Sequence, residues 1–450
     1  MTRKGISIFS SILALSVAAG CGGGGASGGG GPVARDARGR TVRTATGAEV
    51  TQEAHDRWTE GLALFTRAEG QGWNGARCDE AVQKFEAAIE AQGGRFVEAR
   101  YMAGAVSARC NRNDAARTYY EQALQMNEHY CPARNGLGVL LMDAGRQQEA
   151  FATFQRALTD DSRCTEAYVN VAVIQRQRGG NDVREALNNL RRALAIDAQY
   201  LPAFNQMALL YLDAAIARDN PQMLDLAGVV CRQAQLIDRD YAPIYNTWGL
   251  INVRQENLIE ALQLFERATR LDNTIFEAYM NFGEITQSFR GYEDSRRAFG
   301  RAVELRGDSY EAHIGLGASL RGLNQLPAAQ AEYERAIQID ANRPEAYFNL
   351  GILYQDYMSG SIEDLERAKR YYGQFVSKAG REARFAEAVE NIQRSCRVQR
   401  PQGRRRHRAR SDDCRPGRVQ NINTALEALT AAAEMQRQMD QRSRQQGGSP

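Results

Sequence analysis

The sequence predicts an all-α fold, a superhelical solenoid of about nine helical hairpins followed by a capping helix and preceded by a disordered N-terminal tether. Two observations support this fold class. Small residues recur at near-constant intervals, and each is followed at a similar distance by a second small residue and a larger one. Self-similarity at a fixed period is typical of arrays whose helical units stack one on the next.

The N-terminus, up to Gly20, has the composition of a secretory leader. Arg3 and Lys4 form a short basic head, and a mostly apolar stretch follows from Ile6 to Ala19. That stretch is too short to cross a bilayer core, which needs about 20 residues in a helix. A basic head, a short apolar run and small residues are the features of a signal peptide. We therefore expect residues 1–20 to be a lipoprotein signal peptide.

The segment Val17-Ala18-Ala19-Gly20-Cys21 resembles a bacterial lipobox. In that family the Cys is acylated and becomes the first residue, so the resemblance implies a covalent lipid on Cys21. Several acyl chains on one residue anchor a protein stably, whereas a single chain is marginal. Gly22 follows, where an Asp would resemble an inner-membrane retention signal. The resemblance to Gram-negative sorting rules thus implies the periplasmic face of the outer membrane.

Residues 21–53 are expected to form a lipidated, Gly-rich tether. Eight glycines lie between residues 22 and 31, and the stretch that follows is poor in large apolar residues. Glycine loses the most conformational freedom on ordering, so such a run resists packing. A flexible chain of this length has an r.m.s. reach of roughly 30 Å. The body of the protein could then search for a partner at some distance from the membrane.

The body, residues 54–380, carries the repeat. Most intervals between the first small residues equal the one that separates Gly104 from Gly138. The small residues are Gly61, Gly104, Gly138, Ala172, Ala208, Gly249, Gly283, Gly317 and Gly351. The larger residues that follow are Phe85, Tyr120, Phe154, Leu190, Cys231, Phe265, Phe299, Tyr333 and Tyr372.

This pattern resembles the tetratricopeptide repeat (TPR), which has the same period. The resemblance implies paired helices that contact closely at the small residue, with the larger residue filling the gap between them. Asp residues end several hairpins, and Pro residues open others, since both favour turns and helix starts. These residues are Asp161, Asp197, Asp238, Asp272 and Asp340, with Pro132, Pro202 and Pro243.

Three hairpins contain extra residues, around Glu69 to Ala76, Asp219 to Asp225 and Met358 to Ile362. Gly, Asn or Pro residues occur in these stretches, so we expect enlarged turns between the paired helices. Extended loops on a scaffold are common binding elements. The alternative is that the extra residues reflect neutral drift.

First helices are expected to line the concave face of the array, and one row of positions on them is apolar with Asn residues beside it. Asn side chains can bond an extended peptide backbone, and apolar positions can hold its side chains. The alternative is that these residues only pack between helices. The candidate groove residues are Asn135, Val139, Val169, Val173, Asn205, Leu209, Asn246 and Leu250.

The eight cysteines suggest an oxidising compartment. Antiparallel stacking would bring Cys78 near Cys110 and Cys131 near Cys164, and Cys396 and Cys414 flank a basic segment. We expect these three pairs to be disulfides. Cys231 occupies a larger-residue position and is expected to be a buried free thiol. No Cys or His spacing indicates a metal site.

The C-terminal region divides into four segments. Residues 381–396 are expected to form a capping helix, because an array must cover its last apolar face. Residues 397–418 form an Arg-rich linker, either a solvated segment or a site for an anionic envelope polymer. Residues 419–442 have the apolar spacing of an amphipathic helix, and 443–450 are expected to be disordered. The basic patch comprises Arg404, Arg405, Arg406, Arg408 and Arg410.

Nothing in the sequence predicts an enzyme. The four histidines lie in separate segments without a triad or metal companion, and no phosphate-binding loop or nucleophile elbow occurs. No cofactor is expected beyond the lipid on Cys21, and no catalytic or metal-ligating residue is assigned. The formal charge of +3 is small for 450 residues and gives no argument for nucleic acid.

Lipobox, tether, TPR array and Arg-rich end together resemble the TPR lipoproteins of Gram-negative envelope machines, most of all the adventurous-gliding-motility TPR lipoproteins of myxobacteria. The resemblance implies a periplasmic scaffold that binds protein partners in a trans-envelope motility complex. Two alternatives stay open: a pilotin-like assembly factor for a secretin or pilus, and a periplasmic peptide-binding receptor.

Overall fold

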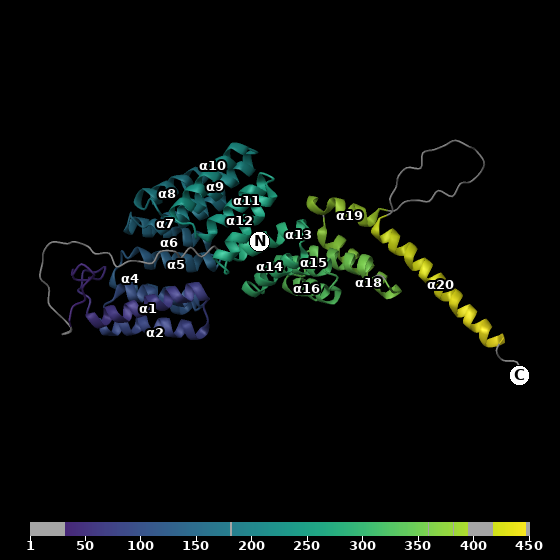
Figure 1. Ribbon diagram of the computed structural model, residues 1–450, viewed down its shortest axis with the longest axis horizontal. Helices are drawn as coiled ribbons and strands as arrows, with labels where there is room; N and C mark the ends of the chain where they lie inside the picture. The colour runs from purple at the N-terminus through teal and green to yellow at the C-terminus, as the bar shows by residue number, and fades with distance from the viewer. Residues whose placement is uncertain (1–31, 181, 359, 381, 395–416, 447–450) are drawn as a thin grey trace. The chain divides into compact units, whose positions relative to one another are not determined.

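The computed structural model describes residues 32–180, 182–358, 360–380, 382–394 and 417–446 (Figure 1). The predicted signal peptide, Cys21, residues 22–31, Cys396, Cys414 and the basic patch at 404–410 lie outside these residues. Within them, every named element is a helix, and β-structure is limited to three isolated bridges. None of the described helices is long and apolar enough to cross a membrane.

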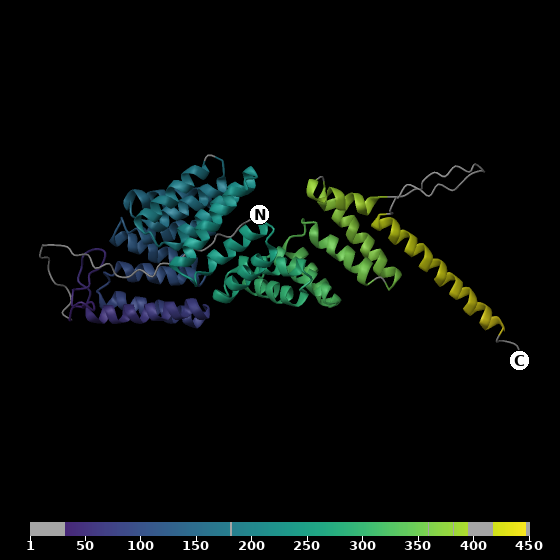
Figure 2. The ribbon, with the colours of Figure 1, turned by 45° about the horizontal axis from the view of Figure 1, so that its top comes forward.

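The helices pair into hairpins, and the chain divides into two compact units, one ending at Thr274 and the other beginning at Ile275. The first unit contains six stacked hairpins (Figure 2). Their helices are α1 Gln52–Gln71, α2 Gly75–Ala91, α3 Val97–Arg109, α4 Asn113–Met126, α5 Cys131–Asp143, α6 Gln147–Asp160, α7 Thr165–Arg178, α8 Asp182–Ile196, α9 Leu201–Arg218, α10 Pro221–Ile237, α11 Ala242–Arg254 and α12 Leu258–Leu271.

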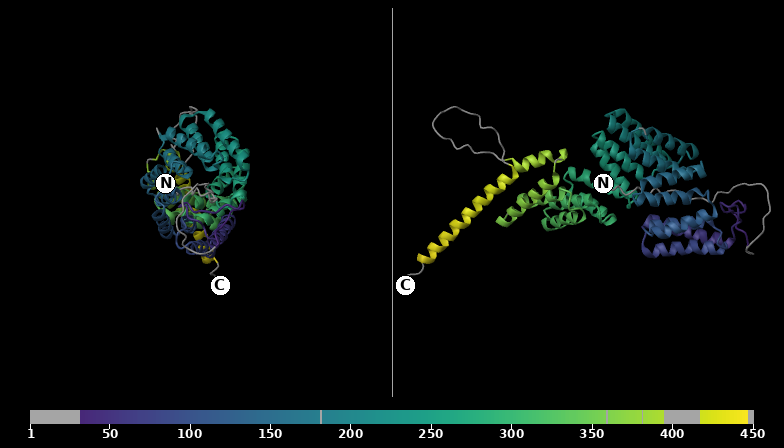
Figure 3. Two further views of the ribbon diagram at one scale, coloured as in Figure 1. Left: turned by 90° about the vertical axis from the view of Figure 1, so that its left-hand side faces the viewer. Right: turned by 180° about the vertical axis from the view of Figure 1, so that it is seen from behind.

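The second unit contains three hairpins and a helical C-terminal region (Figure 3). In its last hairpin the first helix continues as a π-helix, η1. The elements are α13 Phe276–Ser288, α14 Tyr292–Leu305, α15 Tyr310–Gly322, α16 Leu326–Ile339, α17 Glu345–Ile352, η1 Leu353–Tyr357, α18 Ile362–Ala379, η2 Ala383–Phe385, α19 Ala386–Gln393 and α20 Arg418–Gln446. The predicted fold class, a TPR-type solenoid of nine hairpins, is confirmed.

The recurrent glycines lie where the paired helices touch. A Cβ added at Gly283 would come within 2.9 Å of the Phe299 ring, closer than real Cβ contacts occur. Phe299 also contacts Gly315 of the next hairpin in the same way. One aromatic ring therefore fills the space between two hairpins, and a larger residue at either glycine would push the helices apart.

In two hairpins, residues other than glycine and an aromatic residue fill the contact between the paired helices. Where Ala172 or Ala208 replaces the glycine, the partner is Leu190 or Cys231 instead of an aromatic residue. All four side chains are buried, with at most 1% of their surface exposed. A larger first residue is thus matched by a smaller second one, as close packing at constant volume requires.

The Asp residues that end second helices form the turns predicted from the sequence. Each Asp side chain accepts a hydrogen bond from the backbone N–H two residues later, at 2.8 or 2.9 Å. Such a bond reproduces a backbone turn and satisfies the N–H of a residue in that turn. The residues are Asp161, Asp197, Asp238, Asp272 and Asp340.

The expectation of enlarged turns is wrong for the first and fifth hairpins. There the extra residues lengthen the helices: α1 has 20 residues and α9 has 18, against 13 in α3. The turn of the fifth hairpin consists of Asp219 and Asn220 alone. Adding helical turns keeps the backbone hydrogen-bonded, which a longer loop does not.

Residues 32–51 also depart from the prediction, because they pack instead of extending the tether. Ala34, Val42 and Val50, evenly spaced along the segment, are buried. Their backbones form a closed cycle in which each N–H donates to the carbonyl of another, at 2.8 to 3.0 Å. Two turns connect them, and Gln92 holds the segment by bonds to Glu49 and Thr51. Packed structure is therefore present from residue 32 onward, ahead of the predicted boundary at residue 54.

The last hairpin is covered by two helices, not by one capping helix. Ile392 of α19 and Ile422 of α20 are each 1% exposed and pack on the final core cluster. Arg418 fixes the start of α20, because its Nη1 lies 2.9 Å from Asp356 and donates to Gln355 at 2.8 Å. The helix predicted at 419–442 runs to Gln446, so part of the expected disordered tail is helical.

Candidate functional site

The first helices of consecutive hairpins lie against one another, while second helices do not. In the first unit α3 contacts α5, α5 contacts α7, α7 contacts α9 and α9 contacts α11. Among the described residues, successive second helices make no contacts of comparable extent with one another. Closer spacing on one side bends the stack, so the first helices line its inner face. In the second unit α13, α15 and α17 are related in the same way.

The structure divides the eight predicted groove residues into two groups. Five of them are buried, because no more than 6% of the surface of each is exposed. These residues are Asn135, Val139, Val169, Val173 and Asn205. Three others on α9 and α11 are partly exposed: Leu209, Asn246 and Leu250. The accessible part of the predicted row is therefore limited to the fifth and sixth hairpins.

Two of the predicted asparagines bond to neighbouring hairpins. Asn170 donates to Asn135 at 2.8 Å, and Thr247 donates to Asn205 at 2.7 Å. A buried amide needs such a partner, because an unsatisfied one costs about 1–3 kcal/mol. These side chains therefore join adjacent first helices, which is the packing alternative considered for this row.

An open hollow of about 380 Å³ adjoins the sixth hairpin. Leu224, Gly228 and Arg232 line it from α10, and Trp248 and Asn252 line it from α11. The partly exposed Leu250 lies on the same helix as Trp248. Apolar, amide and charged side chains around a shallow hollow suit an extended or helical segment of another protein.

Both described cysteine pairs form the predicted disulfides. The Cα atoms of Cys78 and Cys110 are 6.1 Å apart, and those of Cys131 and Cys164 are 5.9 Å apart. Each bond joins two consecutive hairpins. Cys231 is a buried free cysteine, as predicted, and burial raises the pKa of its thiol to about 12. It therefore stays protonated and unreactive at neutral pH.

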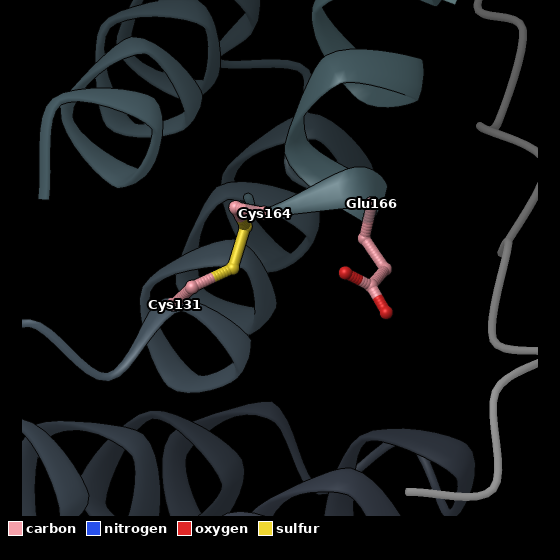
Figure 4. Close-up of side chains that lie close together, drawn as sticks. All are labelled: Cys131, Cys164 and Glu166. Carbon is pink, nitrogen blue, oxygen red and sulfur yellow. A yellow bond between two sulfur atoms is a disulfide. The ribbon is translucent and has the colours of Figure 1, made fainter. Parts of the chain in front are cut away.

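Cys131, Cys164 and Glu166 converge in space (Figure 4). This is the only group of its kind among the described residues that could hold a metal by ligand type. The two sulfurs are joined in a disulfide and offer no thiolate to a metal ion. The Glu166 carboxylate therefore lies beside a disulfide bond.

The sequence analysis did not single out the glutamates that open several first helices. The second residue of four such helices is Glu98, Glu166, Glu277 or Glu311. Acidic residues in a first turn are favoured by the helix dipole, so the recurrence alone indicates helix capping. The sequence pattern did not predict that Glu98 is buried, with 6% of its surface exposed. The recurrence at a fixed repeat position was the available signal.

Comparison with known families finds matches in both units. A family described as "Tetratricopeptide repeat" matches residues 73–130 and 109–163, and one described as "TPR repeat" matches 317–356. These ranges cover hairpins whose glycines and aromatic residues pack as described above. No curated protein matches the sequence.

Several solved structures are similar to this chain at low sequence identity. One is a chain of the APC/C hetero-tetramer Cut9–Hcn1, 11% identical with a TM-score of 0.50; the match covers 70% of the present chain and 55% of that one. A thermophilic TPR protein of Thermus thermophilus is 22% identical with a TM-score of 0.39, covering 42% and 99%. Pseudomonas aeruginosa PilF is 19% identical with a TM-score of 0.41, covering 51% and 97%. The first likeness shows the fold alone, and the other two are weaker.

Proposed function

We propose that this tetratricopeptide-repeat protein is a lipid-anchored periplasmic scaffold that binds protein partners along the inner face of its first helices. The observation that carries the proposal is the bent stack of hairpins, in which successive first helices contact one another from α3 to α11. Repeat arrays use such surfaces for extended contacts with other proteins. The accessible residues there, Leu209, Asn246 and Leu250, combine apolar and amide groups.

Affinity purification of the full chain from crosslinked membranes tests partner binding. A scaffold should retain a defined set of proteins that a variant with a disrupted inner face, Leu209→Asp with Leu250→Asp, does not retain. Recovery of the same set by both chains would contradict binding through this face. Failure to recover any protein with the wild-type chain would contradict the scaffold function itself.

The lipid anchor rests on the lipobox at Cys21 and on the compartment indicated by the cysteines. Two disulfides in the described part of the chain suit an oxidising periplasm, since cytosolic thiols stay reduced. Growth with radiolabelled palmitate should label the wild-type protein and not a Cys21→Ser variant. The labelled protein should fractionate with the outer membrane, and an unlabelled wild-type protein in the soluble fraction would contradict the anchor.

Among envelope machines, the resemblance of the whole layout favours a gliding-motility complex. Deletion of the gene should then abolish gliding while secretin multimers remain intact at the outer membrane. Loss of secretin multimers with gliding unaffected would contradict this assignment and support the pilotin-like alternative. Restoring gliding with the wild-type chain, but not with Cys21→Ser, would connect the anchor to the machine.

A further inference from the structure

The same repeat position, six residues before the recurrent small residue, holds a glutamate in five first helices, but its surroundings differ between the two units. In the second unit each of the three carboxylates has an arginine partner, and for Glu345 these are Arg343 and Arg384. Arg306 Nη2 lies 2.9 Å from Glu277 Oε1, and Arg343 Nη1 lies 2.5 Å from Glu311 Oε1. These pairs show which cation this repeat position accepts.

Arg306 and Arg343 also lie over an aromatic ring at the start of the same helix. The Arg306 guanidinium is 4.1 Å from the ring centroid of Phe276, and that of Arg343 is 3.9 Å from that of Tyr310. A planar guanidinium can stack on a ring while its edge donates hydrogen bonds to a carboxylate, which an ammonium cannot do as well. The second unit thus contains two complete arginine sites built from its own residues.

In the first unit the acids at this position have no such partner. Glu98 accepts a hydrogen bond from the Ala45 N–H at 2.6 Å through Oε1, while its Oε2 is buried without a partner. No described cation acts on the carboxylate of Glu98 or of Glu166. Burial raises the pKa of both groups, and for Glu166 the acidic side chains of Asp161 and Asp197 add to the rise.

Tyr130 connects the two acids. Its side chain is 6% exposed, and its hydroxyl is buried without a hydrogen-bond partner in the described chain. Burial is the main reason that its pKa is raised, and Glu98 and Glu166 both add to the rise, so the hydroxyl lies near both carboxylates. The Tyr130 ring packs edge-on against Tyr101, with centroids 6.1 Å apart. A buried, unsatisfied hydroxyl that feels the charge of two carboxylates needs an explanation.

A disulfide holds this arrangement in place. Tyr130 directly precedes Cys131, and Glu166 follows Cys164 by two residues. The bond between these cysteines therefore ties the start of α5 to the start of α7, and Figure 4 shows the Glu166 carboxylate beside it. A site whose side chains are fixed before binding loses less entropy when it is filled.

We propose that Glu98, Tyr130 and Glu166 form a recognition site for an arginine side chain of a protein partner. The inference rests on the proposed scaffold function and names the chemistry of its ligand. The guanidinium would donate to the free Glu98 oxygen, to Glu166 and to the Tyr130 hydroxyl, with the rings of Tyr130 and Tyr101 beside it. It would also compensate two carboxylates, the buried Glu98 and the partly exposed Glu166, that the chain leaves without a cation in its described part.

A matched pair of peptides tests the site on the full chain. The probe is an octapeptide of alternating arginine and glycine, capped at both ends, and its control carries neutral citrulline in place of arginine. Calorimetry should show at least about tenfold weaker binding of the citrulline peptide, since neutral citrulline cannot form charge-assisted hydrogen bonds with the carboxylates. Glu98→Gln with Glu166→Gln should weaken the arginine peptide by a similar factor.

A double variant at two exposed glutamates, Glu80→Gln with Glu121→Gln, removes the same charge outside the site and should bind as the wild type does. Equal binding of both peptides, no binding of the arginine peptide, or equal loss in both double variants would each overturn the proposal. If the Glu98 and Glu166 double variant still recovers the full set of proteins from membranes, this site is wrong while the scaffold function stands.

One further variant distinguishes a partner's arginine from the chain's own. The eight arginines between residues 397 and 415 could supply the same group. Replacing all eight by glutamine should leave the affinity for the arginine peptide unchanged. A tenfold gain in that affinity would show that the chain's own segment occupies the site and would overturn the assignment to a partner.

Discussion

The two units of this chain use the same repeat but stabilise it by different means. The first unit joins successive hairpins with two disulfides and leaves Glu98 and Glu166 without a cation; the second, in its described residues, has no disulfide and pairs Glu277 and Glu311 with arginines. Packing of helix on helix is common to both. The comparison teaches that a repeat position can serve either as an internal ion pair or as an unfilled site, provided that other bonds hold the hairpins together.

Reduction should give the largest difference between the units. The disulfides join cysteines 32 and 33 residues apart, which corresponds to about 3–4 kcal/mol each in the chain-entropy account. We expect dithiothreitol to lower the melting temperature of the first unit much more than that of the second, where the one predicted bond, between Cys396 and Cys414, does not join two hairpins. Hydrogen exchange measured peptide by peptide separates the two units, and equal loss of protection in both would contradict the difference.

Overpacking the second unit should produce the next largest effect. Gly283→Leu places a side chain against the Phe299 ring, so we expect a loss of about 1–3 kcal/mol or more. Gly300→Leu is the matched control, because a Cβ at Gly300 meets no atom within 4 Å. Urea unfolding curves compare the two variants. Equal stability would show that the glycine is not the contact point between the paired helices.

Exchanging the two packing solutions should test volume compensation in the first unit. Leu190→Phe alone should cost about 1–3 kcal/mol, since Ala172 leaves no room for a ring. Adding Ala172→Gly recreates the glycine–aromatic pair of the other hairpins and should restore part of that loss. The coupling free energy comes from a double-mutant cycle. Purely additive effects would mean that the two positions do not share one space.

The acids should respond to pH in opposite directions in the two units. Burial raises the pKa of Glu98, so its contribution to stability is greatest below its ordinary value of 4.5 and is lost as the pH rises through the raised pKa. Burial also pushes the pKa of Glu311 upward, but Arg343 outweighs it and the net pKa is lowered. The stability from Glu311 is thus present above 4.5 and is lost as the pH falls through the lowered pKa.

At pH 7, Glu98→Gln should therefore stabilise the protein slightly, and Glu311→Gln should destabilise it by less than about 1 kcal/mol, because that pair is partly exposed. Both differences should shrink toward zero as the medium is made acidic. Thermal melts across a series of pH values measure them. The same sign for both variants would contradict the contrast between an unpaired and a paired acid.

The sequence predicted the hairpins because their cause is local and repeated. A small residue must occur wherever two helices touch, so Gly283, Gly317 and Gly351 recur at the repeat period whatever surrounds them. The turns at Asp161 and Asp340 were predictable for the same reason, since a side chain that bonds its own backbone needs no distant partner.

Features that depend on distant contacts were not predicted. The packed segment at 32–51 has only Ala34, Val42 and Val50 as buried apolar residues among polar ones, and its partner Gln92 lies far along the chain in α2's C-terminal cap. Burial of the groove asparagines depends on side chains of neighbouring hairpins, as Asn135 and Asn170 show. Nor does local spacing reveal whether a first-turn glutamate will meet an arginine.

Photocrosslinking in living cells tests the central claim that the inner face of the first helices binds protein. Benzoylphenylalanine would replace Leu250 on the inner helix α11 and, separately, Gln233, which is exposed on the second helix α10. The account predicts a defined protein adduct from position 250 and none from position 233. Adducts from position 233 alone, or no adduct from position 250, would contradict it.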